Sequence, residues 1–269
     1  MPDLDLSSLS HRLADIAAQH SLPNFRTPLE VHAKADASPV TMADRAAEAA
    51  MRALLREVVP THGILGEEHG RERLDADHVW VLDPIDGTKS FITGSPLWGT
   101  LIALVHRGRA ELGLIDMPVL GERWIGSAGH GAHRNGRAVR TSGCTMLAKA
   151  RIVTTSPDAF APDEWAAYDT LSRACAMRRF GGDCYGYAQL AGGHVDLVAE
   201  CQLQPYDYMA LVGVVEGAGG VITDWRGRQL GIHSDGRVLA SATAELHRQA
   251  LEFLAGVPEE GGAQSVSQA

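Results

Sequence analysis

The chain has 269 residues, of which 45% are hydrophobic and 21% charged, and it contains 29 glycines and 12 prolines. This balance is typical of a folded globular protein, excludes disorder over most of the length, and suffices for one large domain or two that share an interface. The net charge of −9 argues against nucleic acid and anionic membranes as partners, because an acidic surface repels both.

The first 145 residues predict an α+β half. Leucine and isoleucine recur at helical spacing in 5–20 and in 42–58, so both segments are predicted to be amphipathic helices. The segment 31–41 between them is too polar for a core strand and predicts a hairpin or loop. From residue 78 onward, short apolar runs separated by Gly and Pro predict the strands of a sheet.

Residues 146–257 predict a mixed α/β half, because strand-like and helix-like segments alternate there. The predicted strands are 151–156, 196–200 and 220–225, and the predicted helices are 165–177, 185–195 and 207–219. Residues 258–269 lack apolar periodicity, which predicts a frayed tail.

The cysteines and histidines carry no recognisable site of their own. The four cysteines lack C-x-x-C spacing, no apolar run reaches ~18 residues, and we expect no signal peptide. We therefore expect reduced thiols and a cytoplasmic protein. The histidines lack H-x-x-x-H and H-x-H spacing, which disfavours a zinc site.

Two carboxylates, Asp83 and Asp86, directly follow an apolar strand. Pro84 removes an N–H group and is predicted to end the strand, Gly87 permits close backbone approach, and a helix beginning near Thr88 would offer N–H groups to an anion. Carboxylates beside an anion site repel phosphate unless cations lie between them, so the segment indicates hard metal ions such as Mg²⁺. An ordinary turn with an Asp N-cap is the alternative.

Two other acidic positions are ambiguous when taken alone. Glu67 and Glu68 follow the apolar pair Ile64-Leu65, and this pattern also fits a solvated turn. Asp207 lies between two tyrosines at the start of a helical run, where it could act only as an N-cap.

Together these residues resemble the inositol monophosphatase family of Mg²⁺-dependent, lithium-sensitive phosphatases. The resemblance covers roughly residues 10–255 and depends on five blocks in order: Lys34, P-V-T-x-A-D ending at Asp44, G-E-E at 66–68, W-V-L-D-P-I-D-G-T at 80–88, and Asp207 ahead of E-G-A-G-G-V at 216–221. Family membership implies a layered αβαβα sandwich of mixed α/β class, and a homodimer.

The resemblance also implies a role for each matching residue. Two or three Mg²⁺ ions would be bound by Glu67, Asp83, the Ile85 carbonyl, Asp86 and Asp207, with Asp83 bridging two of them. Thr88 and Glu67 would hold the attacking water, Asp44 would orient Thr88, and Lys34 would lie near the outer metal. Asp86, Gly87 and Thr88 would contact the substrate.

Three longer strings, at 86–104, 181–187 and 193–208, look like the histidinol-phosphate phosphatase branch of the family, and Tyr206 replaces the Trp usual in inositol-specific enzymes. This branch implies hydrolysis of L-histidinol phosphate in histidine biosynthesis. Asp183 and Glu200 would then contact the cationic leaving group, with a helix N-cap and a solvated strand end as the respective alternatives. An inositol phosphate or another small phosphomonoester is the alternative substrate, and a non-catalytic, metal-responsive regulator is the alternative function.

Overall fold

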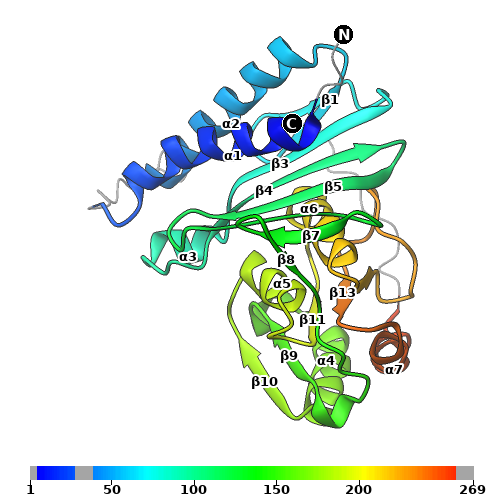
Figure 1. The fold of residues 1–269 in the computed structure, drawn as a ribbon. Helices are drawn as coiled ribbons and strands as arrows, with labels where there is room; N and C mark the ends of the chain where they lie inside the picture. The colour runs from blue at the N-terminus through cyan, green and yellow to red at the C-terminus, as the bar shows by residue number, and fades with distance from the viewer. Residues whose placement is uncertain (1–4, 28–38, 259–269) are drawn as a thin grey trace.

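The computed structural model describes residues 5–27 and 39–258, and for residues 39–41 the backbone only. Its described elements form five layers, in which helices cover both outer faces and fill the space between two sheets (Figure 1). This arrangement confirms the predicted αβαβα sandwich of mixed α/β class.

The first layer consists of α1 (Leu6–Ser21) and α2 (Pro39–Val58), which lie side by side over one face of the first sheet (Figure 1). Asp5 caps α1 by accepting hydrogen bonds from the N–H groups of Ser7 and Ser8, both at 3.1 Å. The apolar stripes of both helices meet the sheet in one cluster, which includes Leu9, Leu13, Met51, Leu55, Trp80, Leu82, Ile102 and Leu104.

The first sheet has eight strands in the order β2-β1-β3-β4-β5-β6-β7-β8. They are β1 (Gly63–Gly66), β2 (Gly70–Glu72), β3 (His78–Asp86), β4 (Gly99–His106), β5 (Arg109–Met117), β6 (Glu122–Ser127), β7 (Gly131–Arg134) and β8 (Arg137–Val139). Among the described strands of this sheet, only β1 and β3 pair in parallel, so their carboxyl ends lie at the same edge of the sheet.

The second sheet has five strands in the order β10-β9-β11-β13-β12. They are β9 (Arg151–Thr154), β10 (Met177–Phe180), β11 (Leu197–Glu200), β12 (Val221–Thr223) and β13 (Val238–Ser241). Two helices, α4 (Pro162–Ala174) and α7 (Ala244–Leu254), cover its outer face (Figure 1).

The layer between the sheets contains α5 (Cys184–Ala191) and α6 (Pro205–Gly217) (Figure 1). The sequence of α6 is apolar on nearly all sides, as expected for a helix packed on both faces. Gly213 permits its close approach to β5, because a Cβ there would lie 2.3 Å from the backbone nitrogen of Gly113.

Several sequence predictions differ from the structure. Pro84 does not end β3, which continues to Asp86, and α2 begins at Pro39 instead of residue 42. β2, β10, β13 and α7 were not predicted. Lys34 and residues 259–269 lie outside the described residues. Among the described helices, none is long and apolar enough to cross a membrane.

Candidate active site

The parallel pairing of β1 and β3 brings Glu67 next to Asp83. Gly66, the last residue of β1, pairs with Leu82, and the Glu67 N–H donates a hydrogen bond to the Leu82 carbonyl at 3.3 Å. The residues that follow this pair on the two strands are the carboxylates. Two acidic positions separated by 16 residues therefore meet at one edge of the sheet because of strand register alone.

A β-bulge places Asp83 and Asp86 on the same face. Asp83 pairs with Leu101 and Asp86 with Gly99, so three steps along β3 oppose two steps along β4. In a regular strand, side chains three residues apart point to opposite faces of the sheet. The extra residue of a bulge brings these two side chains to the same face. The Thr100 hydroxyl stabilises the bulge by donating a 2.8 Å hydrogen bond to the buried Pro84 carbonyl.

Asp207 reaches the same point from the middle layer. It lies in the first turn of α6, where its carboxylate accepts a 2.7 Å hydrogen bond from the Gln204 N–H. The N-cap is thus Gln204, and the alternative in which Asp207 is itself the cap is wrong. Carboxylate oxygens of Asp83, Asp86 and Asp207 all lie within 4.8 Å of one another.

A second acidic group adjoins the first. Carboxylate oxygens of Asp44, Glu67 and Glu68 also lie within 4.8 Å of one another. The Asp44 side chain projects from α2, is 3% exposed, and leaves its Oδ1 without a hydrogen-bond partner among the described residues. Glu67 is exposed. The two groups together form an acidic cleft, defined here by Asp44, Glu67, Glu68, Asp83, Asp86 and Asp207.

The carboxylates of the acidic cleft resist ionisation. Burial, followed by repulsion from Glu67, Glu68 and Glu48, raises the pKa of Asp44 to about 8. Burial also raises the pKa of Asp207 to about 7, and it raises the pKa of Asp83 and of Asp86 well above the ordinary aspartate value, with further increases from neighbouring carboxylates. So many acidic oxygens, one of them buried without a partner, fit a bound hard cation.

Gly87 and Thr88 form the turn beyond Asp86. Gly87 is left-handed, with φ +82°, and a Cβ there would lie 2.9 Å from the Asp183 Cγ. Thr88 is exposed and begins the short helix α3 (Thr88–Ile92), as predicted. Asp183 is the N-cap residue of α5, as the alternative expected, but its side chain makes no capping hydrogen bond to that helix and instead accepts one from the Ser90 hydroxyl at 2.6 Å.

A cavity of about 400 Å³ extends from this turn between the sheets. It is lined at one end by Asp86, Gly87, Thr88 and Asp207, and elsewhere by Asp183, Thr155, Tyr187 and Glu200. Glu200 is 6% exposed, and it accepts hydrogen bonds from the Thr155 N–H at 2.8 Å, the Thr155 hydroxyl, and the Tyr187 hydroxyl at 3.0 Å. The alternative of a solvated strand end is therefore wrong.

Sequence reasoning missed Thr155, Tyr187 and Ser90, which hold the two acidic side chains of the cavity. Tyr187 lies in the G-G-D-C-Y-G-Y string, so a signal for it was present. Thr155 and Ser90 become identifiable only once the strands and the turn are placed in space.

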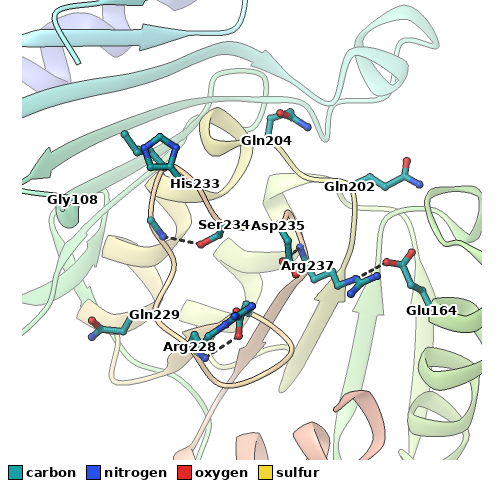
Figure 2. A pocket seen from close by; sticks show the side chains of 13 residues that line it. Gly108, Glu164, Gln202, Gln204, Arg228, Gln229, His233, Ser234, Asp235 and Arg237 are labelled. Carbon is teal, nitrogen blue, oxygen red and sulfur yellow. Dashed lines mark hydrogen bonds and ion pairs between the residues drawn. The ribbon is translucent and has the colours of Figure 1, made fainter. Parts of the chain in front are cut away.

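A larger hollow, of about 940 Å³, lies elsewhere, between α4 and the loop 224–237 (Figure 2). It contains a buried ion pair between Arg237 and Glu164, with Nε and Oε1 2.7 Å apart. None of the predicted site residues that the structure describes lines it.

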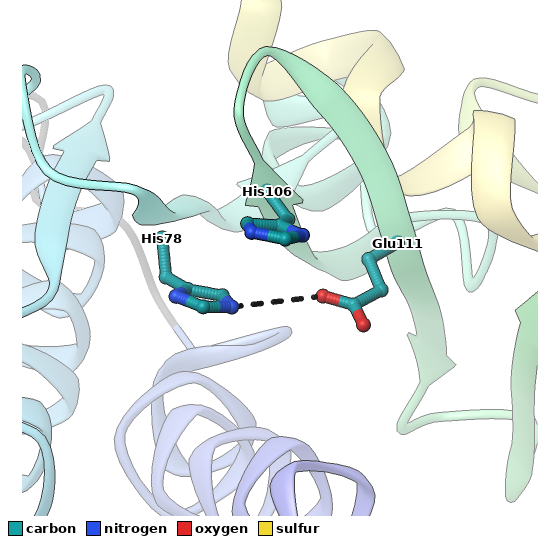
Figure 3. Close-up of side chains that lie close together, drawn as sticks. All are labelled: His78, His106 and Glu111. Carbon is teal, nitrogen blue, oxygen red and sulfur yellow. Dashed lines mark ion pairs between the residues drawn. The ribbon is translucent and has the colours of Figure 1, made fainter.

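His78, His106 and Glu111 form a third group with closely spaced ligand atoms (Figure 3). The planes of the two imidazoles are 3° from parallel and their centroids are 4.3 Å apart. The lone pairs of the ring nitrogens lie in the planes of the two imidazoles. Because these planes are parallel, the lone pairs of His78 and His106 do not converge on a single metal ion. His78 is also the first residue of β3, at the opposite end from Asp86.

Comparison with known proteins identifies the family. The family model described as the inositol monophosphatase family matches residues 5–258. The chain is 45% identical over 257 residues to "Bifunctional phosphatase IMPL2, chloroplastic" of Arabidopsis thaliana, covering 92% of this chain and 74% of that protein. It is 37% identical over 242 residues to a histidinol-phosphatase of Chlorobaculum parvum, covering 89% and 92%.

A solved structure of an inositol monophosphatase from Zymomonas mobilis is 46% identical, with a TM-score of 0.89 and coverage of 95% of this chain and 99% of that one. The fold, the acidic cleft and these similarities define a phosphoric monoester hydrolase. The chain belongs to the inositol monophosphatase family.

Proposed function

We propose that the protein is a Mg²⁺-dependent phosphatase that converts L-histidinol phosphate to L-histidinol. The observation that carries this proposal is the cavity that leads away from the acidic cleft, because two further carboxylates, Asp183 and Glu200, line it. Histidinol bears an ammonium group and an imidazole, and a pocket with carboxylates suits such a cation. The similarity to a histidinol-phosphatase supports the same substrate.

The acidic cleft would hold two or three Mg²⁺ ions. Oxygen ligands would come from Glu67, Asp83, Asp86, Asp207 and the Ile85 carbonyl. By the family pattern Asp83 would bridge two ions, and Glu67, Asp86 and Asp207 are all close enough to raise its pKa. When bound, these ions supply positive charge for the phosphate oxygens and lower the pKa of the attacking water. Mg²⁺ prefers hard oxygen ligands, which this set provides exclusively.

The remaining residues of the site would bind and orient the reactants. By the family pattern, Glu67 and the exposed Thr88 hydroxyl would hold the water, and Asp44 on α2 would orient Thr88. The left-handed Gly87 leaves room for the phosphate to approach the backbone N–H groups of the turn. Lys34 is proposed from the family pattern alone.

Asp183 and Glu200 would select the leaving group. The hydrogen bonds from Thr155 and Tyr187 fix the Glu200 carboxylate in one orientation. Burial raises the pKa of Glu200, so a bound ammonium group would favour its ionised form. The Glu200 carboxylate would stabilise a bound cation more than a neutral polyol. This difference in binding free energy would favour histidinol phosphate over an inositol phosphate.

The similarity to a solved inositol monophosphatase keeps inositol 1-phosphate as a second candidate substrate. Phosphate release from both esters, from fructose 1,6-bisphosphate and from 3′-phosphoadenosine 5′-phosphate, with Mg²⁺ or EDTA, separates the candidates. We expect a preference of ~100-fold in kcat/KM for histidinol phosphate, equivalent to about 2.7 kcal/mol. Similar Mg²⁺-dependent rates on several esters would refute the substrate, and inactivity on all of them would favour the regulatory alternative.

A further inference from the structure

A buried ion pair lies beneath the turn that carries Glu67, and the proposed reaction does not use it. Glu48 and Arg52 are one turn apart on α2, with 0% and 3% exposure, and the Glu48 Oε1 is 2.6 Å from the Arg52 Nε. Replacing a buried ion pair by apolar side chains is often neutral or stabilising, so stability alone does not explain this pair.

The Glu48 carboxylate holds the backbone on the carboxyl side of Glu67. It accepts a 2.7 Å hydrogen bond from the N–H of Glu68 and a 3.1 Å hydrogen bond from the N–H of His69. On the other side of Glu67, a Cβ at Gly66 would lie only 2.1 Å from the Glu48 Oε1. The carboxylate therefore packs against the backbone on both sides of Glu67.

Arg52 completes the attachment where the turn enters β2. Its Nη2 donates a 2.5 Å hydrogen bond to the Gly70 carbonyl, and its Nη1 lies 3.6 Å from the Glu72 carboxylate. The pair thus fixes the connection between β1 and β2 from Gly66 to Gly70, and it does so from the same helix that carries Asp44.

We infer that Glu48 and Arg52 are positioning residues that set the affinity of the acidic cleft for Mg²⁺ by fixing Glu67. The inference rests on the proposed metal site. Without the pair, Glu67 would lie on an exposed turn and would have to be ordered when the ion binds, which costs conformational entropy. Groups that orient metal ligands in this way typically contribute 10–100-fold in metal affinity.

Electrostatics alone predicts the opposite result for one substitution. Arg52→Met removes a positive charge from beneath the acidic cleft, so the potential becomes more negative and Mg²⁺ would bind more tightly. If positioning dominates, the same substitution weakens binding, because Glu48 loses the contact that holds it. The direction of the change therefore distinguishes the two effects.

The test is calorimetric titration of Mg²⁺ into the full chain without substrate, together with amide hydrogen exchange at Glu68 and His69. For Arg52→Met we expect a Kd for Mg²⁺ raised ~10-fold or more and faster exchange at both amides, with KM for the phosphate ester little changed at saturating Mg²⁺. An unchanged or lowered Kd in the folded variant would overturn the inference.

Glu164→Gln is the matched control, because Glu164 and Arg237 form an equally short, buried pair that lines the larger hollow and not the acidic cleft. It should lower stability and leave the Kd for Mg²⁺ unchanged. If Arg52→Met fails to fold, Arg52→Lys replaces it as the test, because lysine keeps the positive charge but lacks the several N–H donors of the guanidinium. For this variant we expect a Kd for Mg²⁺ above the native value by up to ~10-fold. A native Kd in this variant would overturn the inference. Absence of Mg²⁺ binding by the native protein would instead refute the proposed metal site.

Discussion

Asp83→Asn should have opposite effects on stability and on activity. Asp83 is 1% exposed, and its carboxylate lies within 4.8 Å of those of Asp86 and Asp207. At that distance a pair of full charges repels by about 3.5 kcal/mol with an effective dielectric constant of ~20. Burial and neighbouring carboxylates raise the pKa of each of these groups, so protonation already relieves part of this repulsion, and we expect the substitution to relieve about 1–3 kcal/mol more.

Asparagine preserves the local hydrogen bond, because the Ile85 N–H donates to the Asp83 Oδ1 at 3.0 Å and an amide oxygen accepts equally well. In EDTA at pH 8 the variant should therefore melt higher than the native protein, by roughly 2–4 °C for each kcal/mol gained. Added Mg²⁺ should raise the Tm of the native protein and have little effect on the variant. Turnover should fall by several orders of magnitude, because a bridging ligand charge is lost.

The assay is differential scanning calorimetry with and without Mg²⁺, combined with phosphate release. Asp196→Asn is the matched control, because Asp196 is equally buried but lies 2.8 Å from the Arg151 Nε. That variant should melt lower with or without Mg²⁺. A lower Tm for Asp83→Asn in EDTA, or near-native turnover at saturating Mg²⁺, would refute the reasoning.

Further predictions concern pH, recognition, the turn and lithium. Because the pKa values of Asp44 and Asp207 are raised, the metal-free folded protein retains protons that the unfolded chain has lost. The free energy of unfolding in EDTA should therefore fall as the pH rises from about 4 to 8. Urea melts that show a rise over this range would contradict the prediction. Glu200→Gln should lower kcat/KM for histidinol phosphate ~10-fold more than for a neutral phosphate ester; equal losses would indicate general damage. Gly87→Ala should lower the free energy of unfolding, measured by urea melts, by about 1–2 kcal/mol, because alanine disfavours the left-handed backbone. Turnover should fall by a larger factor than this loss of stability implies. A variant with native stability and turnover would contradict the close approach to Asp183. Lithium at tens of millimolar should inhibit phosphate release, since a weak hard-cation site would need roughly that concentration, and insensitivity would count against the family-derived expectation.

Part of the acidic cleft could be predicted from the sequence, and part could not. The adjacency of Asp83 and Asp86 to an apolar strand was visible, as was the glycine that follows them. The sequence did not show that Asp83 and Asp86 share a face, because this depends on a bulge. The Thr100 hydroxyl that stabilises the bulge comes from the neighbouring strand. Pro84 was therefore expected to end a strand that in fact continues.

Glu200 illustrates a second limit. In the sequence it is the last residue of an apolar strand, a position that is usually solvated. It is buried because Tyr187 on α5 and Thr155 after β9 close over it, and neither contact follows from local pattern. The assignment of Asp183 and Glu200 to the leaving group, like the homodimer and the cytoplasmic location, stays a prediction.

The strands that the sequence missed are short or polar, whereas the missed helix α7 has 11 residues and an apolar face that could have been recognised. β10 contains two arginines and is mostly exposed, so it lacks the apolar alternation of a half-buried strand. β13 has only four residues, which is too few for periodicity to separate strand from loop. The mixed α/β class was predictable from the pattern of helices and strands despite these omissions, whereas the order of the layers was implied by the family resemblance.

The central claim, that the acidic cleft is a Mg²⁺ site, is tested most directly by titrating Mg²⁺ into the native protein at pH 7 in buffers of different ionisation enthalpy. Burial raises the pKa of the proposed ligand Asp207 to about 7 and that of the adjacent Asp44 to about 8, so both are partly protonated at this pH. A cation bound to Asp207 displaces its proton, and its charge favours ionisation of Asp44. The account predicts saturable binding with release of about one proton or more per protein molecule. No saturable binding, or binding without proton release, would contradict it.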